Sequence, residues 1–167
     1  MVAAYLVVGS TGAGKTTYAR EIAKKYHAQV FSIDEWMQTL FWMDAPAGVS
    51  TDESAKWALE RVARCEKQIW AVASKLLDDG QAVVLDLGFS KKAQREQFRE
   101  WAKLRRHPTV THFLDLPVEQ RWARVQKRNA EKSGTYTFDV DRKTFDWMED
   151  FFEALAGDEL ARAVVRG

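Results

Sequence analysis

Residues 3–16 read Ala-Ala-Tyr-Leu-Val-Val-Gly-Ser-Thr-Gly-Ala-Gly-Lys-Thr, an apolar run that leads directly into a glycine-rich loop. The loop matches Gly-x-x-x-x-Gly-Lys-Thr, with Gly9, Gly14, Lys15 and Thr16 at the fixed positions, and a helical pattern follows it. Glycines let several backbone N–H groups turn toward an anion, and the helix presents the positive end of its dipole. The sequence therefore predicts a phosphate-binding loop between a strand and a helix.

This loop predicts a nucleoside triphosphate as ligand, with ATP and Mg²⁺ as the expected cofactors. The Lys15 ammonium would reach the outer phosphates, and the Thr16 hydroxyl would ligate Mg²⁺. The loop residues expected to bind ATP are Gly9, Ser10, Thr11, Gly12, Ala13, Gly14, Lys15, Thr16 and Thr17. The alternative is a glycine turn that only joins a strand to a helix.

Length and charge limit the classes of protein that fit. The chain has 167 residues, which predicts a single domain over residues 1–167. Its 25 basic and 24 acidic residues leave a net charge of +1, so no global field favours nucleic acid or a membrane surface. Cys65 is the only cysteine, and the first residues lack a basic leader, so we expect a cytoplasmic protein.

Apolar runs alternate with helical patterns along the chain. Strands are expected at residues 3–8, 29–33, 82–85 and 110–114, while residues 161–165 fit either a fifth strand or the extension of a helix. This alternation predicts an α/β fold, with a parallel sheet of four or five strands and helices on both faces.

Three cap signals mark helix starts. Ser50 and Glu53 have the spacing of a capping box, Ser90 is a candidate N-cap for a helix over residues 91–105, and Pro117 fits the first turn of the helix that follows it.

Two acids follow predicted strands, where a parallel sheet gathers the groups that act on a ligand. Asp86 follows the strand at 82–85, and we expect it near Thr16 as a metal or substrate ligand; the alternative is a turn residue. Asp34 follows the strand at 29–33, where a carboxylate would accept a proton from an attacking hydroxyl. The alternative for Asp34 is the N-cap of the next helix.

Three arginines share one face of the helix after Pro117. Arg121, Arg124 and Arg128 are spaced three and four residues apart, so they would project together over the triphosphate and offset its charge. The alternative is a solvated face paired with neighbouring acids. The polar segment that follows predicts a lid around residues 121–140.

Aromatic residues are frequent, with seven tryptophans in the chain. Trp36 and Trp42 follow Asp34, where an acceptor pocket should form, so their rings are candidates to stack a substrate ring; core packing is the alternative. For the other tryptophans, which fall in predicted helices, burial is a sufficient explanation: Trp57, Trp70, Trp101, Trp122 and Trp147.

The chain resembles the small phosphate-loop kinases of the zeta-toxin, polynucleotide-kinase and chloramphenicol-phosphotransferase type, which often carry an AAA label. The resemblance rests on the glycine-rich loop, on Ser-Ile-Asp-Glu-Trp at 32–36, on Val-Val-Leu-Asp-Leu-Gly-Phe at 83–89, on Arg95, and on the arginine series that ends in Arg128-Asn129. AAA machines carry an acid pair after the third strand, whereas this chain has Asp86-Leu87.

This resemblance implies a nucleoside-kinase-like strand order 2-3-1-4-5 and phosphoryl transfer from ATP to a hydroxyl. It implies Asp34 as the base, and Lys15 with Arg124 or Arg128 as charge stabilisers. Substrate contacts would come from Asp34, Trp36, Asp86 and Arg95, although a surface role for Arg95 is equally open.

Three functions remain open. The first is an ATP-dependent kinase for a small molecule or a nucleotide end. The second is an ATP-hydrolysing switch; a GTP switch is disfavoured because no Asn-Lys-x-Asp occurs. The third acts on nucleic-acid ends, which the near-neutral charge disfavours. It would need a basic face from Lys91, Lys92, Arg95, Arg99, Lys103, Arg105 and Arg106.

Overall fold

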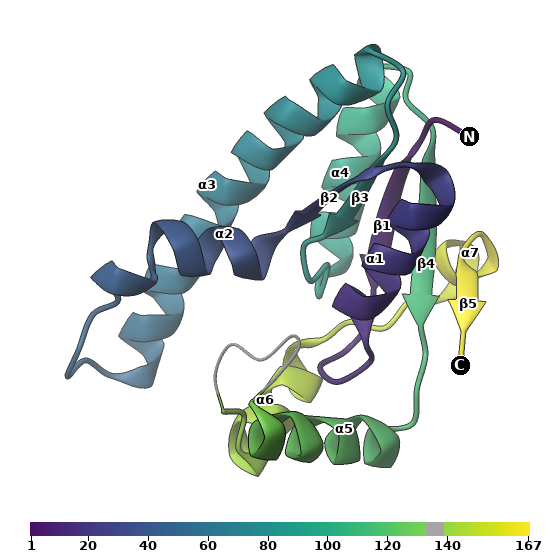
Figure 1. Ribbon diagram of the computed structural model, residues 1–167. Helices are drawn as coiled ribbons and strands as arrows, with labels where there is room; N and C mark the ends of the chain where they lie inside the picture. The colour runs from purple at the N-terminus through teal and green to yellow at the C-terminus, as the bar shows by residue number, and fades with distance from the viewer. Residues whose placement is uncertain (133–138) are drawn as a thin grey trace.

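A five-stranded parallel sheet lies at the centre of the computed structural model, which describes residues 1–132 and 139–167 (Figure 1). The strand order is β2-β3-β1-β4-β5, which confirms the predicted order and fold class. The strands are β1 Ala4–Val8, β2 Gln29–Ser32, β3 Val83–Asp86, β4 Thr109–Leu114 and β5 Val164–Arg166.

Helices cover both faces of the sheet. They are α1 Lys15–Tyr26, α2 Ile33–Leu40, α3 Thr51–Asp78, α4 Lys92–Leu104, α5 Val118–Glu131, α6 Arg142–Phe151 and α7 Gly157–Ala161, with a short 3₁₀ turn, η1, at Trp42–Asp44. In Figure 1, α1 covers one face and α3 with α4 the other. The helices α2 and the first half of α3 project as an arm, whereas α5 and α6 lie beyond the carboxyl ends of the strands. All helices in the described parts of the chain are too short or too polar to span a bilayer.

Strand β1 is buried along its whole length because both of its faces are covered. Leu6 and Val8 pack in the cluster that includes Ile69 of α3 and Phe98 of α4. Tyr5 and Val7, on the opposite face, pack in the cluster with α1. Alternate side chains of a strand point to opposite faces, so a strand between two helical layers is an uninterrupted apolar run. This double burial fixes the point at which β1 delivers the chain to the glycine-rich loop.

Two cap predictions had different outcomes. Ser50 and Glu53 form the predicted capping box at the start of α3. The prediction for Ser90 is wrong, because α4 begins after Lys91, which offers no side-chain cap. Instead, a Glu153 carboxylate oxygen accepts a hydrogen bond from the Lys92 backbone N–H at 2.9 Å. A residue 61 positions further along the chain thus replaces the local cap.

The C-terminal residues form the fifth strand of the sheet, for which the sequence allowed either a strand or the extension of a helix. Residues 164–166 are a strand, with His112 to Leu114 of β4 in register with Val164 to Arg166 of β5. The short helix α7 comes before this strand, so residues 161–165 contain both of the structures considered.

Arg95 is the largest of the fully buried side chains. Its Nε and Nη2 atoms each lie 2.8 Å from a carboxylate oxygen of Glu159, and Nη1 donates to the carbonyl oxygens of Phe89 at 3.0 Å and Glu153 at 2.9 Å. Arg95 therefore fastens α4 to the C-terminal segment. Since its guanidinium is enclosed by protein acceptors, its placement does not support the expected substrate contact.

We expect Arg95→Met to lower the free energy of unfolding by about 3 kcal/mol, because it leaves the Glu159 carboxylate buried with only Arg99 as a partner. Urea unfolding followed by tryptophan fluorescence measures this loss. The control is Lys92→Met on the same helix, where the exposed pair with Glu96 contributes under about 1 kcal/mol. Equal losses for the two variants would contradict the structural role of Arg95.

Candidate active site

The glycine-rich loop is shaped by backbone conformations that only glycine adopts easily. Gly12 and Gly14 have φ angles of +80° and +88°. A Cβ atom on Gly12 would lie 2.5 Å from the Arg121 carbonyl oxygen, and one on Gly9 would lie 3.0 Å from the Leu114 carbonyl oxygen. The loop therefore packs closely against the end of β4 and the start of α5, and larger residues would push it out of shape.

Lys15 is held inside this loop. Its Nζ donates a hydrogen bond to the Ser10 carbonyl oxygen at 3.1 Å. Burial lowers the pKa of the Lys15 ammonium, while the nearby carboxylates of Asp86 and Asp34 partly offset that effect. An anion bound in the loop would add negative charge beside the ammonium and stabilise its protonated form.

Thr16 and Asp86 meet across the carboxyl ends of β1 and β3. The Thr16 hydroxyl donates to Oδ2 of Asp86 at 2.8 Å, although the two residues are 70 positions apart. Burial raises the pKa of Asp86, and Lys15 and the Thr16 hydrogen bond oppose that rise. The parallel pairing of β1 with β3 creates this contact, as the two strands end at the same edge of the sheet.

This oxygen pair suits Mg²⁺, which takes oxygen ligands and is commonly bound by one or two protein groups together with substrate phosphates. Within the described residues, no group of three or more His, Cys, Asp or Glu side chains could hold a metal ion.

Asp34 lies in the first turn of α2, at the next strand end along the sheet. Its carboxylate is exposed and lines the same cavity as Lys15 and Asp86. The N-cap of α2 is Ser32, whose Oγ accepts from the Glu35 backbone N–H at 3.4 Å. The capping alternative for Asp34 is therefore wrong, and within the described residues no hydrogen bond or ion pair occupies its carboxylate.

The three arginines of α5 divide into two kinds. Arg121 is 5% exposed and forms a two-pronged ion pair with Glu149 of α6. It also donates to the carbonyl oxygens of Leu116 at 2.9 Å and Thr11 at 3.2 Å. Arg121 therefore holds α5 and α6 against the loop. The pairing with an acid matches the alternative expected for these arginines, but the solvated face of that alternative is wrong for Arg121, which is buried.

Arg124 and Arg128 line the cavity. Nη1 of Arg124 lies 3.4 Å from the Ala13 carbonyl oxygen, at the loop. The Nε atom of Arg128 is buried without a hydrogen-bond partner in the described residues. These two side chains bring positive charge to the loop, where an anion could satisfy it. Of the predicted lid at 121–140, residues 133–138 lie outside the described residues.

The cavity has a volume of about 990 Å³. Besides the loop and the charged residues above, it is lined by Leu59 of α3, Ser90, and Trp147, Met148 and Phe151 of α6. The sequence analysis assigned none of these residues to the site. Its burial explanation for Trp147 is wrong, because that residue is 54% exposed, and helical spacing does not show whether a tryptophan ring is buried. Trp36 does not line the cavity; it packs against the core cluster next to α3, so the expected substrate stacking by Trp36 is not supported.

Comparison with known proteins identifies the family and the fold of the chain. A family model described as AAA domain matches residues 5–155. Comparison with the curated proteins finds no match. Among solved structures, an unliganded sugar kinase from a Janibacter species is 21% identical, with a TM-score of 0.64, and the match covers 99% of this chain and 85% of that one.

Two further similar structures contain nucleotides. Kti12 of Chaetomium thermophilum, in complex with ADP-AlF3, is 20% identical with a TM-score of 0.60, over 90% of this chain and 80% of that one. The APS kinase of Mycobacterium tuberculosis, in complex with AMPPNP and APS, is 20% identical with a TM-score of 0.55, over 83% of this chain and 79% of that one. These likenesses show a shared fold. Because the family model spans most of its length, the chain belongs to the AAA domain family, with the fold of the small P-loop kinases.

Proposed function

We propose that this protein is an ATP- and Mg²⁺-dependent kinase that transfers the γ-phosphoryl group to a hydroxyl of a small molecule or nucleotide. The observation that carries the proposal is the convergence of three groups on one cavity. These are the Lys15 ammonium, the Thr16–Asp86 oxygen pair and the exposed Asp34 carboxylate. The first two suit a metal-bound triphosphate, and the third suits removal of a proton from an acceptor.

In this mechanism Asp34 accepts the proton of the acceptor hydroxyl while the oxygen of that hydroxyl forms a bond to the γ-phosphorus. The bond between that phosphorus and the β–γ bridging oxygen breaks, and ADP leaves. Lys15 stabilises the charge that develops on the phosphoryl oxygens, and Arg124 and Arg128 supply further positive charge from α5. Bound Mg²⁺, held by Thr16 and Asp86, would neutralise phosphate charge.

The nucleic-acid alternative loses support from the distribution of basic residues. Of the seven residues that could form a basic face, six pair with acids within the described residues, and Arg95 is buried. The six are Lys91, Lys92, Arg95, Arg99, Lys103 and Arg105. Such pairing leaves little unopposed charge for a phosphate backbone.

The hydrolysing-switch alternative also has less support. Such an enzyme needs a group that activates water next to the metal site, and the residue after Asp86 is Leu87, which is 2% exposed. Asp34, in contrast, opens to a cavity large enough for a second ligand beside the nucleotide.

Lys15→Ala should weaken ATP binding and lower the turnover number by at least about a hundredfold, because no other cation takes its place within the loop. Calorimetry with AMPPNP and an ADP-release assay measure the two effects. Lys24→Ala, at the far end of the same helix, serves as the control and should behave as wild type. Unchanged turnover in Lys15→Ala would refute the assignment.

Asp34→Asn should lower kcat for an acceptor by roughly 100-fold or more while the dissociation constant for ATP changes little, because the amide cannot accept the proton. The matched control is Glu35→Gln, the adjacent exposed acid, which interacts with Arg20 at 3.8 Å. Steady-state kinetics and nucleotide titration separate the two quantities. Parallel losses in kcat and ATP affinity would make Asp34 a structural residue.

Asp86→Asn should raise the Mg²⁺ concentration that gives half-maximal activity by roughly 10- to 100-fold, because the metal site loses a charged oxygen group. The measurement is an Mg²⁺ titration at saturating nucleotide. Asp44→Asn, on the exposed turn η1, is the control. An unchanged Mg²⁺ requirement would remove Asp86 from the metal site.

A further inference from the structure

Two exposed hydrophobic side chains line the cavity and are not explained by nucleotide binding at the loop. Among the large hydrophobic residues that are exposed in the described parts of the chain, Leu59 and Trp147 are the two that line it. Each is 54% exposed. They come from different helices, α3 and α6, so the apolar surface belongs to the cavity and not to one helix face.

The Trp147 ring is held in place by a neighbouring aromatic ring. It stacks on Phe151, one helical turn further along α6, with ring centroids 5.3 Å apart and an interplanar angle of 17°. The Lys91 ammonium lies 4.2 Å from the centroid of the Phe151 ring, and Lys91 is paired with Glu153 at 3.3 Å. A tryptophan that is stacked on one side and still half exposed offers a flat apolar surface at low entropic cost.

The order of the strands helps to place the stacked Trp147–Phe151 pair relative to Asp34 and Asp86. Asp86 is the last residue of β3 and is paired with Ser32, the last residue of β2, while Asp34 lies two residues beyond Ser32. Lys91, which contacts Phe151, follows β3 by a few residues, next to the cavity-lining Ser90. Phe151 therefore contacts the segment that follows β3, the strand that ends in Asp86. Arg166, which also lines the cavity, comes from β5 on the opposite edge of the sheet.

We propose that Trp147, supported by Phe151 and joined by Leu59, binds a flat ring of the phosphoryl acceptor. This inference rests on the proposed kinase function and narrows its substrate class to ring-bearing alcohols, such as a nucleoside or an aryl alcohol, in preference to open-chain polyols. The ring stacks on Trp147 while the hydroxyl reaches Asp34. Stacking on an aromatic side chain accepts any nucleobase because every base has a π-face, and a flat ring of the acceptor would stack on Trp147 for the same reason.

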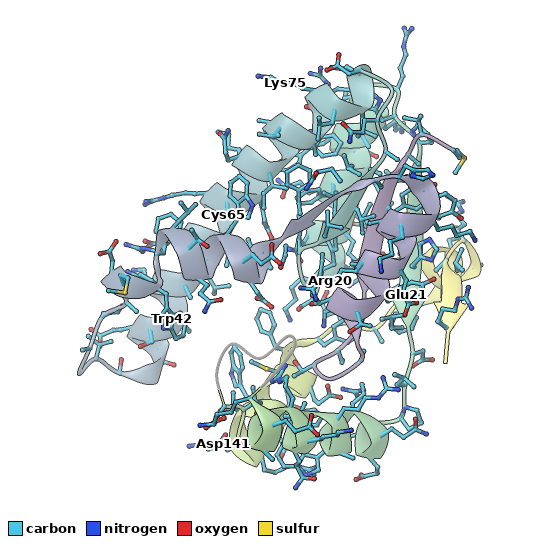
Figure 2. The ribbon with its side chains drawn as sticks, viewed as in Figure 1. Arg20, Glu21, Trp42, Cys65, Lys75 and Asp141 are labelled. Atoms are coloured by element: carbon cyan, nitrogen blue, oxygen red, sulfur yellow. The ribbon has the colours of Figure 1, made fainter. Side chains whose placement is uncertain are left out.

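Trp42 provides a matched control for Trp147. It has the same exposed fraction, 54%, but does not line the cavity, so the substrate stacking expected of Trp42 is not supported. Figure 2 shows Trp42 at the end of the arm, away from Arg20 and Glu21 on α1. Replacing either residue removes the same chemical group from an exposed position, and only one of them belongs to the proposed subsite.

The test measures binding of uridine and tryptophol, as ring-bearing alcohols, and of xylitol and glycerol, as open-chain polyols. Calorimetry is carried out with the nucleotide site saturated with AMPPNP and Mg²⁺. At least one ring compound should bind the wild type more tightly than either polyol. Trp147→Ala should raise the dissociation constant of that ring compound by about tenfold. Trp147→Phe should restore most of the affinity, and Trp42→Ala should leave it unchanged.

Uridine and tryptophol separate a nucleoside from an aryl alcohol as the preferred form. The inference is overturned if neither ring compound binds the wild type, if a polyol binds more tightly, or if Trp147→Ala leaves the ring affinity unchanged. It is also overturned if Trp147→Ala weakens AMPPNP binding instead, because the ring would then serve the nucleotide base. ADP formation with the same compounds tests the kinase function separately, since binding without turnover would refute the kinase and leave the subsite standing.

Discussion

The Arg121 guanidinium connects three parts of the molecule that must be in register for the site to exist. It starts from α5, pairs with Glu149 of α6 and donates to the Thr11 carbonyl of the loop. The Thr11 hydroxyl in turn donates to Sδ of Met148 at 3.1 Å. Arg124 and Arg128 reach the cavity because α5 is held against the loop, and Trp147 lines it because α6 is held there too.

A buried ion pair adds little net stability, because desolvation offsets most of the attraction between the two charges. The chain uses two such pairs in similar ways. Arg121 with Glu149 fixes α6, and Arg95 with Glu159 fixes α7, which leads to β5. Glu149 lies on α6, beyond the carboxyl ends of the strands, and Glu159 lies on α7, next to the β5 edge of the sheet (Figure 1).

The charged groups of the cavity lie where the strands of the sheet end, and their burial determines how their pKa values shift. Burial raises the pKa of Asp86 and lowers that of Lys15, so each ionised group depends on the other for stabilisation. A metal-bound polyphosphate would bring both charges that they need. Asp34 differs because it is exposed. The groups proposed to bind the nucleotide and the proposed base thus lie along the same row of strand ends.

Much of this could be predicted from local patterns. The loop was identifiable because its glycine spacing and its lysine are required by backbone geometry and phosphate charge, both of which act within a few residues. The strands were identifiable because burial on both faces leaves continuous apolar runs, as in β1. The Ser50–Glu53 box was found for the same reason, since its partners are three residues apart.

Contacts between distant residues decided the rest. Arg121 and Arg124 share the same helical spacing in the sequence. Only Arg121 pairs with Glu149, 28 residues further along the chain, and this ion pair gives it a structural role. Glu159, 64 residues from Arg95, drew that side chain into the interior, and Glu153 took the capping role expected of Ser90. Likewise, Trp36 packs against the core while Trp147 stays exposed. Burial and pairing depend on which neighbours the fold brings near, and helical spacing carries no record of those neighbours.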